Sequence, residues 1–155
     1  MKTAFIILLT LIVAMVILLY SIQKFSKAEE VSGIVEGKLS KCPDKPNCVC
    51  SEYIEDTSHY ITPIIIPKNI RVEVLTLLKN IIKEMGGTIQ VESKNYIAVT
   101  FTSVIFKFVD DLEIRIDSVQ KIIHIRSASR VGHGDMGVNK KRTELLKKLY
   151  NDNIS

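Results

Sequence analysis

The sequence predicts an α+β protein: an antiparallel sheet of about five strands in a meander, two amphipathic helices on one face, and one N-terminal transmembrane helix. Three observations predict this fold. The chain begins with a long apolar run, two later segments carry apolar residues at helical spacing, and short β-like segments with brief polar connections lie between them. The 155 residues leave room for one domain.

The segment 4–22 contains no charged residue. A helix of this length roughly matches the hydrocarbon core of a bilayer. A cleaved signal peptide has a shorter apolar region followed by small residues at a cleavage site, whereas this run leads directly to Gln23 and Lys24. We therefore expect a single-pass anchor with its flanks at 1–27, a tether and cysteine-containing loop at 28–58, and an α+β domain at 59–155.

The charge distribution argues against nucleic-acid binding. The formal net charge is +4, but Lys2, Lys24 and Lys27 flank the apolar run, and 18 basic and 17 acidic side chains remain without them. A nucleic-acid-binding surface needs a concentrated basic patch. No nucleic acid is therefore expected among the partners.

The side of the membrane on which the domain lies stays open. The lysines that follow the apolar run place the domain in the cytoplasm by the positive-inside rule. A short basic tail before the run is instead typical of exported anchors, and Glu29, Glu30 and Glu36 dilute the positive charge after it. An extracytoplasmic domain is therefore one of two alternatives.

Hydrophobic periodicity predicts the remaining elements. The segment 42–52, which contains prolines and turn formers, is typical of an irregular loop, and a strand is expected within 59–67. Apolar residues recur at helical spacing over 74–85 and again over 140–151, which predicts the two helices. The predicted strands between them are 88–93, 96–102, 104–109, 112–117 and 121–127.

Three stretches carry a family resemblance: CPDKPNCVCSE at 42–52, FKFVDDLEIRID at 106–117, and IRSASRVGHGDMGVNKKR at 125–142. In this order they resemble the domain of unknown function 1499 family. The resemblance implies an uncharacterised, membrane-associated protein and no particular activity. The chain departs from the family pattern at Cys50, where a small polar residue is usual, and at Val109, where proline is frequent.

Three cysteines, Cys42, Cys48 and Cys50, are spaced C-x5-C-x-C. This spacing matches neither a C-x-x-C redox motif nor paired zinc ligands, so we expect no metal site and no cofactor. In an exported domain a disulfide between Cys42 and Cys48 would close the loop, whereas all three would be free thiols in the cytoplasm. A nucleophilic Cys48 with His59 as its base is the catalytic alternative.

The segment 106–117 contains a second candidate catalytic residue. Its even positions are apolar except for Asp110, so this carboxylate points towards the core if one strand runs through the segment. A buried carboxylate is costly unless it is paired or accepts several hydrogen bonds. A turn at the Asp110–Asp111 pair is the alternative.

Charged residues of the last two predicted strands are expected to pair across the sheet. A turn around 118–120 would place Glu113 opposite Arg126 and bring Asp111 near Arg130. These pairs are interpreted as salt bridges on the outer surface of the sheet.

The start of the last helix is the candidate ligand-binding site. Asn139 is a good N-cap, but the three residues after it are basic, where the helix dipole favours acidic ones. Basic residues become favourable there when an anion binds at the helix N-terminus. An internal carboxylate, Asp135 or Asp110, is the preferred anion, with phosphate, a lipid headgroup or a partner's carboxylate as alternatives. The candidate ligand-binding residues are Arg126, Ser127, Ser129, Arg130, Asn139 and Arg142.

These features predict a membrane-tethered, non-catalytic binding or assembly domain of unknown ligand. One alternative is a Cys- or Asp-dependent hydrolase or transferase that uses the arginines as an anion clamp. Another is a module that binds lipid headgroups. The expected partners are the membrane bilayer and either a membrane protein or an anionic small molecule.

Overall fold

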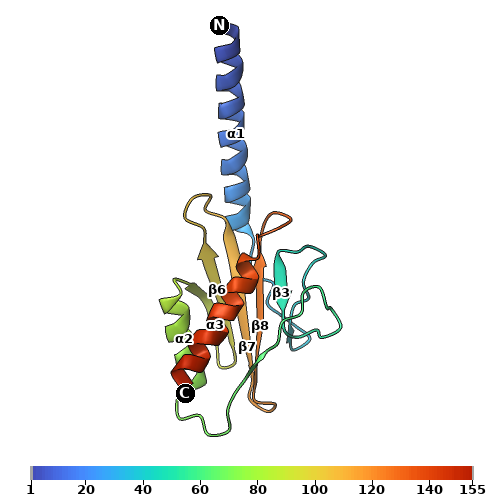
Figure 1. Cartoon of the computed structure of the whole chain (residues 1–155), viewed down its shortest axis with the longest axis vertical. Helices are drawn as coiled ribbons and strands as arrows, with labels where there is room; N and C mark the ends of the chain where they lie inside the picture. Colours follow the sequence, from blue (N-terminus) through green and yellow to red (C-terminus); the bar gives the residue numbers. More distant parts are fainter. Residues whose placement is uncertain (1, 155) are drawn as a thin grey trace.

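The computed structural model describes residues 2–154, and its longest helix, α1 (Lys2–Ala28), projects from one end of an α+β domain (Figure 1). The large apolar side chains of α1 are exposed. At 1.5 Å per residue the helix is about 40 Å long, which exceeds the thickness of a hydrocarbon core. Within residues 2–154, α1 is the one helix long and apolar enough to cross a membrane, although a signal sequence has the same properties.

A six-stranded antiparallel sheet forms the centre of the domain, in the order β3-β8-β7-β6-β5, with β4 also paired to β8. Its strands are β3 (Cys48–Cys50), β4 (Ile64–Ile65), β5 (Thr88–Ser93), β6 (Tyr96–Thr102), β7 (Val109–Asp117) and β8 (Ile122–Ser129). The last four follow one another as neighbours, which confirms the predicted meander.

Two helices, α2 (Val74–Glu84) and α3 (Val138–Ile154), cover the same face of the sheet (Figure 1). The Glu73 carboxylate caps α2 by accepting two backbone N–H groups of its first turn. The apolar core lies between these helices and the sheet, and includes Leu78, Ile82, Ile97, Leu112, Ile125 and Leu146. The expectation of an α+β fold with both helices on one face is confirmed.

The N-terminal segment that follows α1 covers the opposite face of the sheet. It contains a small hairpin of β1 (Ile34–Val35) and β2 (Lys38–Leu39), and the Leu39 side chain is fully buried. The backbone N–H of Gly33 donates to the Glu113 carboxylate of β7 over 2.7 Å. Part of the tether expected within 28–58 therefore packs on the sheet.

Several expected elements differ from the structure. The strand predicted over 104–109 is wrong: the chain turns at 104–106, and β7 begins only at Val109. The Asp-Asp turn is wrong as well, because both aspartates lie within β7. The loop predicted over 42–52 includes β3, and the strand expected within 59–67 is limited to Ile64–Ile65.

Candidate functional site

Alternation along β8 separates the predicted ligand-binding residues onto the two faces of the sheet, because successive side chains of a strand point in opposite directions. Ser127 and Ser129 face the helices, and both contact Asn139 of α3. Arg126, and Arg130 directly after the strand, lie on the face that the N-terminal segment covers. The structure does not bring the two groups together.

On the helix face, Arg142 of α3 connects the strands to the helix. Its guanidinium donates to Asp110 over 2.7 Å, and to Ser127 and Asn139 over 3.2 and 2.5 Å. Asp110 points to this face, as the apolar alternation around it predicts. Its carboxylate is therefore held in an ion pair.

The N-terminus of α3 is occupied by a carboxylate of the chain itself. Asp135 accepts the backbone N–H groups of Gly137 and Asn139 over 2.9 and 2.7 Å. This arrangement satisfies free N–H groups of the first turn and places negative charge where the helix dipole favours it. The preferred interpretation, an internal anion, is confirmed, but Asn139 as N-cap is wrong because α3 begins at Val138.

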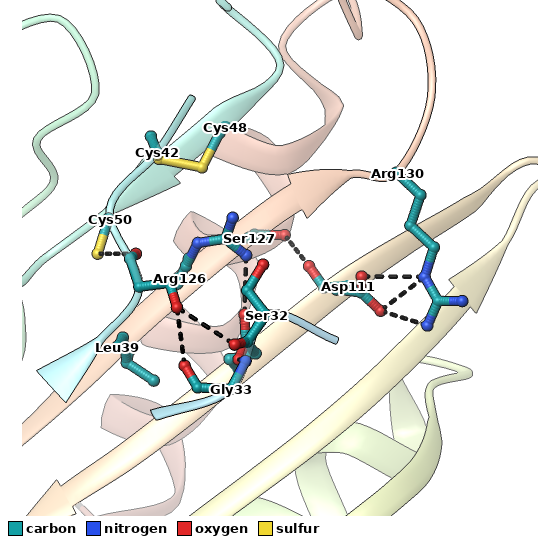
Figure 2. A network of polar contacts seen from close by, with 12 residues as sticks. Ser32, Gly33, Leu39, Cys42, Cys48, Cys50, Asp111, Arg126, Ser127 and Arg130 are labelled. Carbon is teal, nitrogen blue, oxygen red and sulfur yellow. Dashed lines mark hydrogen bonds and ion pairs between the residues drawn. A yellow bond between two sulfur atoms is a disulfide. The ribbon is translucent and has the colours of Figure 1, made fainter. Parts of the chain in front are cut away.

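On the opposite face, Arg130 joins β7 to the end of α1. Its guanidinium makes a bidentate contact with Asp111, with distances of 2.9–3.1 Å (Figure 2). The same group donates to the backbone oxygens of Ser26 and Glu29, where α1 ends. A cation at a helix C-terminus satisfies its free carbonyls and interacts favourably with the dipole. We call Arg130, Asp111, Ser26 and Glu29 the helix clasp.

The Ser26 hydroxyl makes a further hydrogen bond between α1 and the sheet. This side chain is fully buried and accepts the backbone N–H of Val109 over 2.9 Å, at the start of β7. The domain end of α1 is therefore held by contacts to β7 and to the residue after β8. We expect α1 and the sheet to keep a fixed relative orientation.

The most buried ion pair joins Glu113 of β7 to Arg126 of β8. The two side chains face each other in the strand register, as the sequence predicts, and lie 2.8 Å apart. Glu113 also accepts the Tyr96 hydroxyl over 2.8 Å and the Gly33 N–H. Burial and the Glu113 carboxylate raise the pKa of Tyr96 above its ordinary value. The predicted outer location of these pairs is wrong, because the N-terminal segment buries them.

A third buried cluster surrounds Glu52, which precedes the loop leading to β4. Its carboxylate receives two hydrogen bonds from Arg115, of 2.6 and 3.2 Å, and lies 3.5 Å from the His124 ring. Burial lowers the pKa of His124 below its ordinary value, against the opposing effect of Glu52. Sequence reasoning missed Glu52, and no local pattern marks a residue whose partner lies 63 positions away.

The cysteine loop is closed by a disulfide between Cys42 and Cys48 (Figure 2). This pairing is the alternative expected for an exported domain, and it leaves Cys48 without the free thiol that a nucleophile needs. His59, the candidate base, instead lies 2.8 Å from the Asp56 carboxylate and 3.0 Å from the Lys45 carbonyl oxygen. Both ring nitrogens therefore face oxygens of the segments on either side of β3.

Cys50 is a free, buried thiol, and burial raises its pKa to about 11. We expect iodoacetamide to leave the native protein unlabelled at pH 8 and to label one thiol per chain after unfolding without reductant, which mass spectrometry detects. Because the protonated thiol is favoured in the folded state, its contribution to the free energy of unfolding is lost as pH rises from 9.0 to about 11. Labelling of three thiols without reductant would contradict the disulfide.

Among the described residues 2–154, no three His, Cys, Asp or Glu side chains are placed to hold a metal ion. The charged residues of the candidate site are engaged with one another. The pairs are Asp110 with Arg142, Asp111 with Arg130, and Glu113 with Arg126. This arrangement stabilises one geometry of the strands, α3 and the N-terminal segment, and it engages Arg126, Arg130 and Arg142 with carboxylates of the chain.

Comparison with known proteins places the chain in a family. A search of curated proteins found no match. A family model described as "Protein of unknown function (DUF1499)" matches residues 38–149. The match includes the cysteine loop, the whole sheet and most of α3. The chain therefore belongs to the DUF1499 family of proteins of unknown function.

Proposed function

We propose that this protein is a membrane-tethered, non-catalytic binding domain, held in a fixed orientation by the helix clasp and presenting its far end to a protein partner. The observation that carries the proposal is the internal pairing of the candidate cluster. Asp110, Asp111 and Glu113 each contact an arginine of the chain. Groups that act on a substrate need a free position for it, whereas these groups fix the fold.

Neither nucleophile candidate supports the alternative of a hydrolase or transferase. Cys48 is bonded to Cys42, and Asp110 is paired with Arg142. An arginine clamp for a substrate anion has the same difficulty, because the guanidinium groups already bind carboxylates of the chain. A binding role needs none of these groups to be free.

The disulfide supports an extracytoplasmic location of the domain. Disulfides persist in oxidising compartments and are rare in the cytosol. The buried Cys50 thiol is compatible with such a compartment, since a protonated thiol shielded from solvent reacts slowly. The proposed orientation thus places α1 in the bilayer and the domain on its outer side.

A hollow of about 710 Å³ is lined in part by the turn between β7 and β8. This turn lies at the end of the domain away from α1 (Figure 1). The lining of the hollow includes the apolar Ile66, Ile70 and Val74 together with the charged Arg115, Asp117 and Lys121. A mixed lining of this kind suits a polypeptide segment, which offers backbone groups as well as side chains. The clasp would direct this surface away from the membrane.

Photo-crosslinking tests the partner surface. With a photoreactive amino acid in place of Val119, which lines the hollow and is 94% exposed, the full-length chain is expected to form a discrete adduct with a protein in its native membranes. The physical reason is proximity, because the photoreactive group captures only what lies within a side-chain length of the hollow. Adducts are detected by immunoblotting and identified by mass spectrometry.

The matched control is the same photoreactive residue at Ile54, which is 71% exposed and does not line the hollow. The proposal predicts no discrete adduct at this position. Equal adducts at both positions, or no adduct from Val119, would contradict a partner at the far end of the domain.

A further inference from the structure

Two loops of the domain carry exposed apolar side chains. In the loop between β6 and β7, Val104 and Ile105 are 83% and 81% exposed, and Phe106 is half exposed. In the loop between β8 and α3, Met136 is 96% exposed. Large apolar side chains that gather on a surface mark a contact with another apolar body.

The first loop holds its apolar side chains outward by a local hydrogen-bond framework. Ser103 donates its backbone N–H to the Phe108 oxygen, and its hydroxyl accepts the Phe108 N–H over 3.0 Å. The rings of Phe106 and Phe108 stack with their centroids 5.5 Å apart. The hydrogen bonds between Ser103 and Phe108 close the loop, and Val104 and Ile105 lie outside the core.

Both loops adjoin residues that form hydrogen bonds with the end of α1. The first loop leads directly into Val109, whose N–H donates to Ser26, and the second begins at Arg130, which donates to Ser26 and Glu29. In Figure 1 the two loops point from the sheet towards the side from which α1 leaves, one on either side of the helix.

The burial pattern of α1 shows how far the domain reaches along it. Ile22 and Gln23 are partly buried, whereas Lys24 and Phe25 are exposed. Ile22 and Gln23 lie four and three residues before the fully buried Ser26, so they share its face of the helix. The domain therefore lies beside the turn of α1 at which the uncharged run ends.

We infer that the tip of the first loop, Val104 to Phe106, and Met136 of the second loop insert into the interfacial region of the bilayer on either side of α1. The inference rests on the proposed function, in which α1 spans the membrane. A helix that crosses the hydrocarbon core with its uncharged run places Ile22 at the boundary with the headgroups. Apolar side chains held at that level are buried among headgroups and upper acyl chains.

Basic residues beside the tips match this location. Lys107 follows Phe106 in the first loop, and Lys24 and Lys27 lie on the adjoining turns of α1. Lysines near the bilayer surface attract anionic headgroups, while their aliphatic stems remain at the apolar boundary. The domain would thus touch the membrane at three places, which fixes its tilt as well as its distance.

Tryptophan scanning tests the insertion, because the natural chain contains no Trp and each variant reports one position. Ile105→Trp and Met136→Trp are prepared in the full-length chain and reconstituted into phosphatidylcholine vesicles with and without brominated acyl chains. Both positions are exposed, so the fold tolerates the larger side chain. The expected result is a blue-shifted emission of which the brominated lipid quenches the greater part.

Two further positions serve as references. Leu11→Trp lies in the apolar run and is quenched if α1 spans the bilayer, and Val119→Trp lies at the far end of the domain and keeps its emission. If Leu11→Trp is quenched while Ile105→Trp and Met136→Trp behave like Val119→Trp, the insertion is overturned and the anchoring stands. If Leu11→Trp is not quenched, the anchoring and the insertion both fail.

Discussion

Replacing Glu113 with Gln is expected to lower the free energy of unfolding by about 3–5 kcal/mol, since one charge of a buried pair remains without its partner. The Glu113 side chain is fully buried, and the Arg126 guanidinium has no other carboxylate within hydrogen-bond distance among residues 2–154. Its Nε atom is buried without a hydrogen-bond partner in the same described range. Glutamine keeps the shape and an acceptor for Tyr96 and Gly33, but its NH2 group faces Arg126, so the loss includes the hydrogen bond as well as the charge.

Urea unfolding of the full-length chain in detergent, followed by circular dichroism, measures this effect from the transition midpoint at constant slope. Glu144→Gln is the control, because Glu144 lies on the exposed side of α3 and changes the stability by no more than about 0.5 kcal/mol. The double variant Glu113→Leu/Arg126→Leu should recover much of the lost stability, since it removes both charges together. A loss as small as that of the control would show that water reaches Arg126.

The second large effect is expected for Arg130→Met, which leaves the Asp111 carboxylate buried without its partner and releases the end of α1. The free energy of unfolding should fall by about 3 kcal/mol, and more if the covering segment detaches. The amide hydrogens over 26–33 should exchange faster than in the parent protein, because Arg130 no longer holds the Ser26 and Glu29 carbonyls.

Hydrogen exchange with mass spectrometry separates the release of the end of α1 from the general loss of stability. Arg71→Met serves as control, because Arg71 is exposed in the loop before α2 and lies outside the helix clasp. Unchanged exchange over 26–33 in Arg130→Met would mean that the hairpin and Gly33 hold the segment without the clasp.

The central ladder could be predicted because its pattern is local. Apolar and charged residues alternate in β7 from Asp111 to Asp117, and a short turn connects the strand to β8, so the register follows from the sequence. This is why the pairs of Glu113 with Arg126 and of Asp111 with Arg130 are confirmed. Helices α2 and α3 follow from apolar spacing in the same way.

The burial of those pairs could not be predicted, because it depends on a segment far away in the chain. Gly33 is 80 positions from Glu113, and Ser26 is 104 positions from Arg130. A charged face of a strand normally indicates solvent, and nothing local in β7 distinguishes an exposed face from a covered one. The signal that exists lies in the covering segment, which is rich in small residues such as Ser32 and Gly33.

The strand predicted over 104–109 was wrong for a related reason. Val104, Ile105 and Phe106 have the composition of a strand, but the backbone turns there and places their side chains outside the core. The composition of this segment indicates that its side chains need an apolar environment. It does not distinguish the interior of the protein from the bilayer as the source of that environment. Arg126 and Ser127 are adjacent in the sequence but lie on opposite faces of the sheet, because neighbouring side chains of a strand point in opposite directions.

The contacts between the N-terminal segment and the last strands also set the order of folding during synthesis. The segment with Ser26 and Gly33 leaves the ribosome first, but its partners Glu113 and Arg130 come near the end of the chain. Contacts of such large sequence separation form late and slowly. The nascent chain must therefore hold its early part open until β7 and β8 have emerged. On the proposed outer side of the membrane, the domain would close only when its C-terminal third has arrived there.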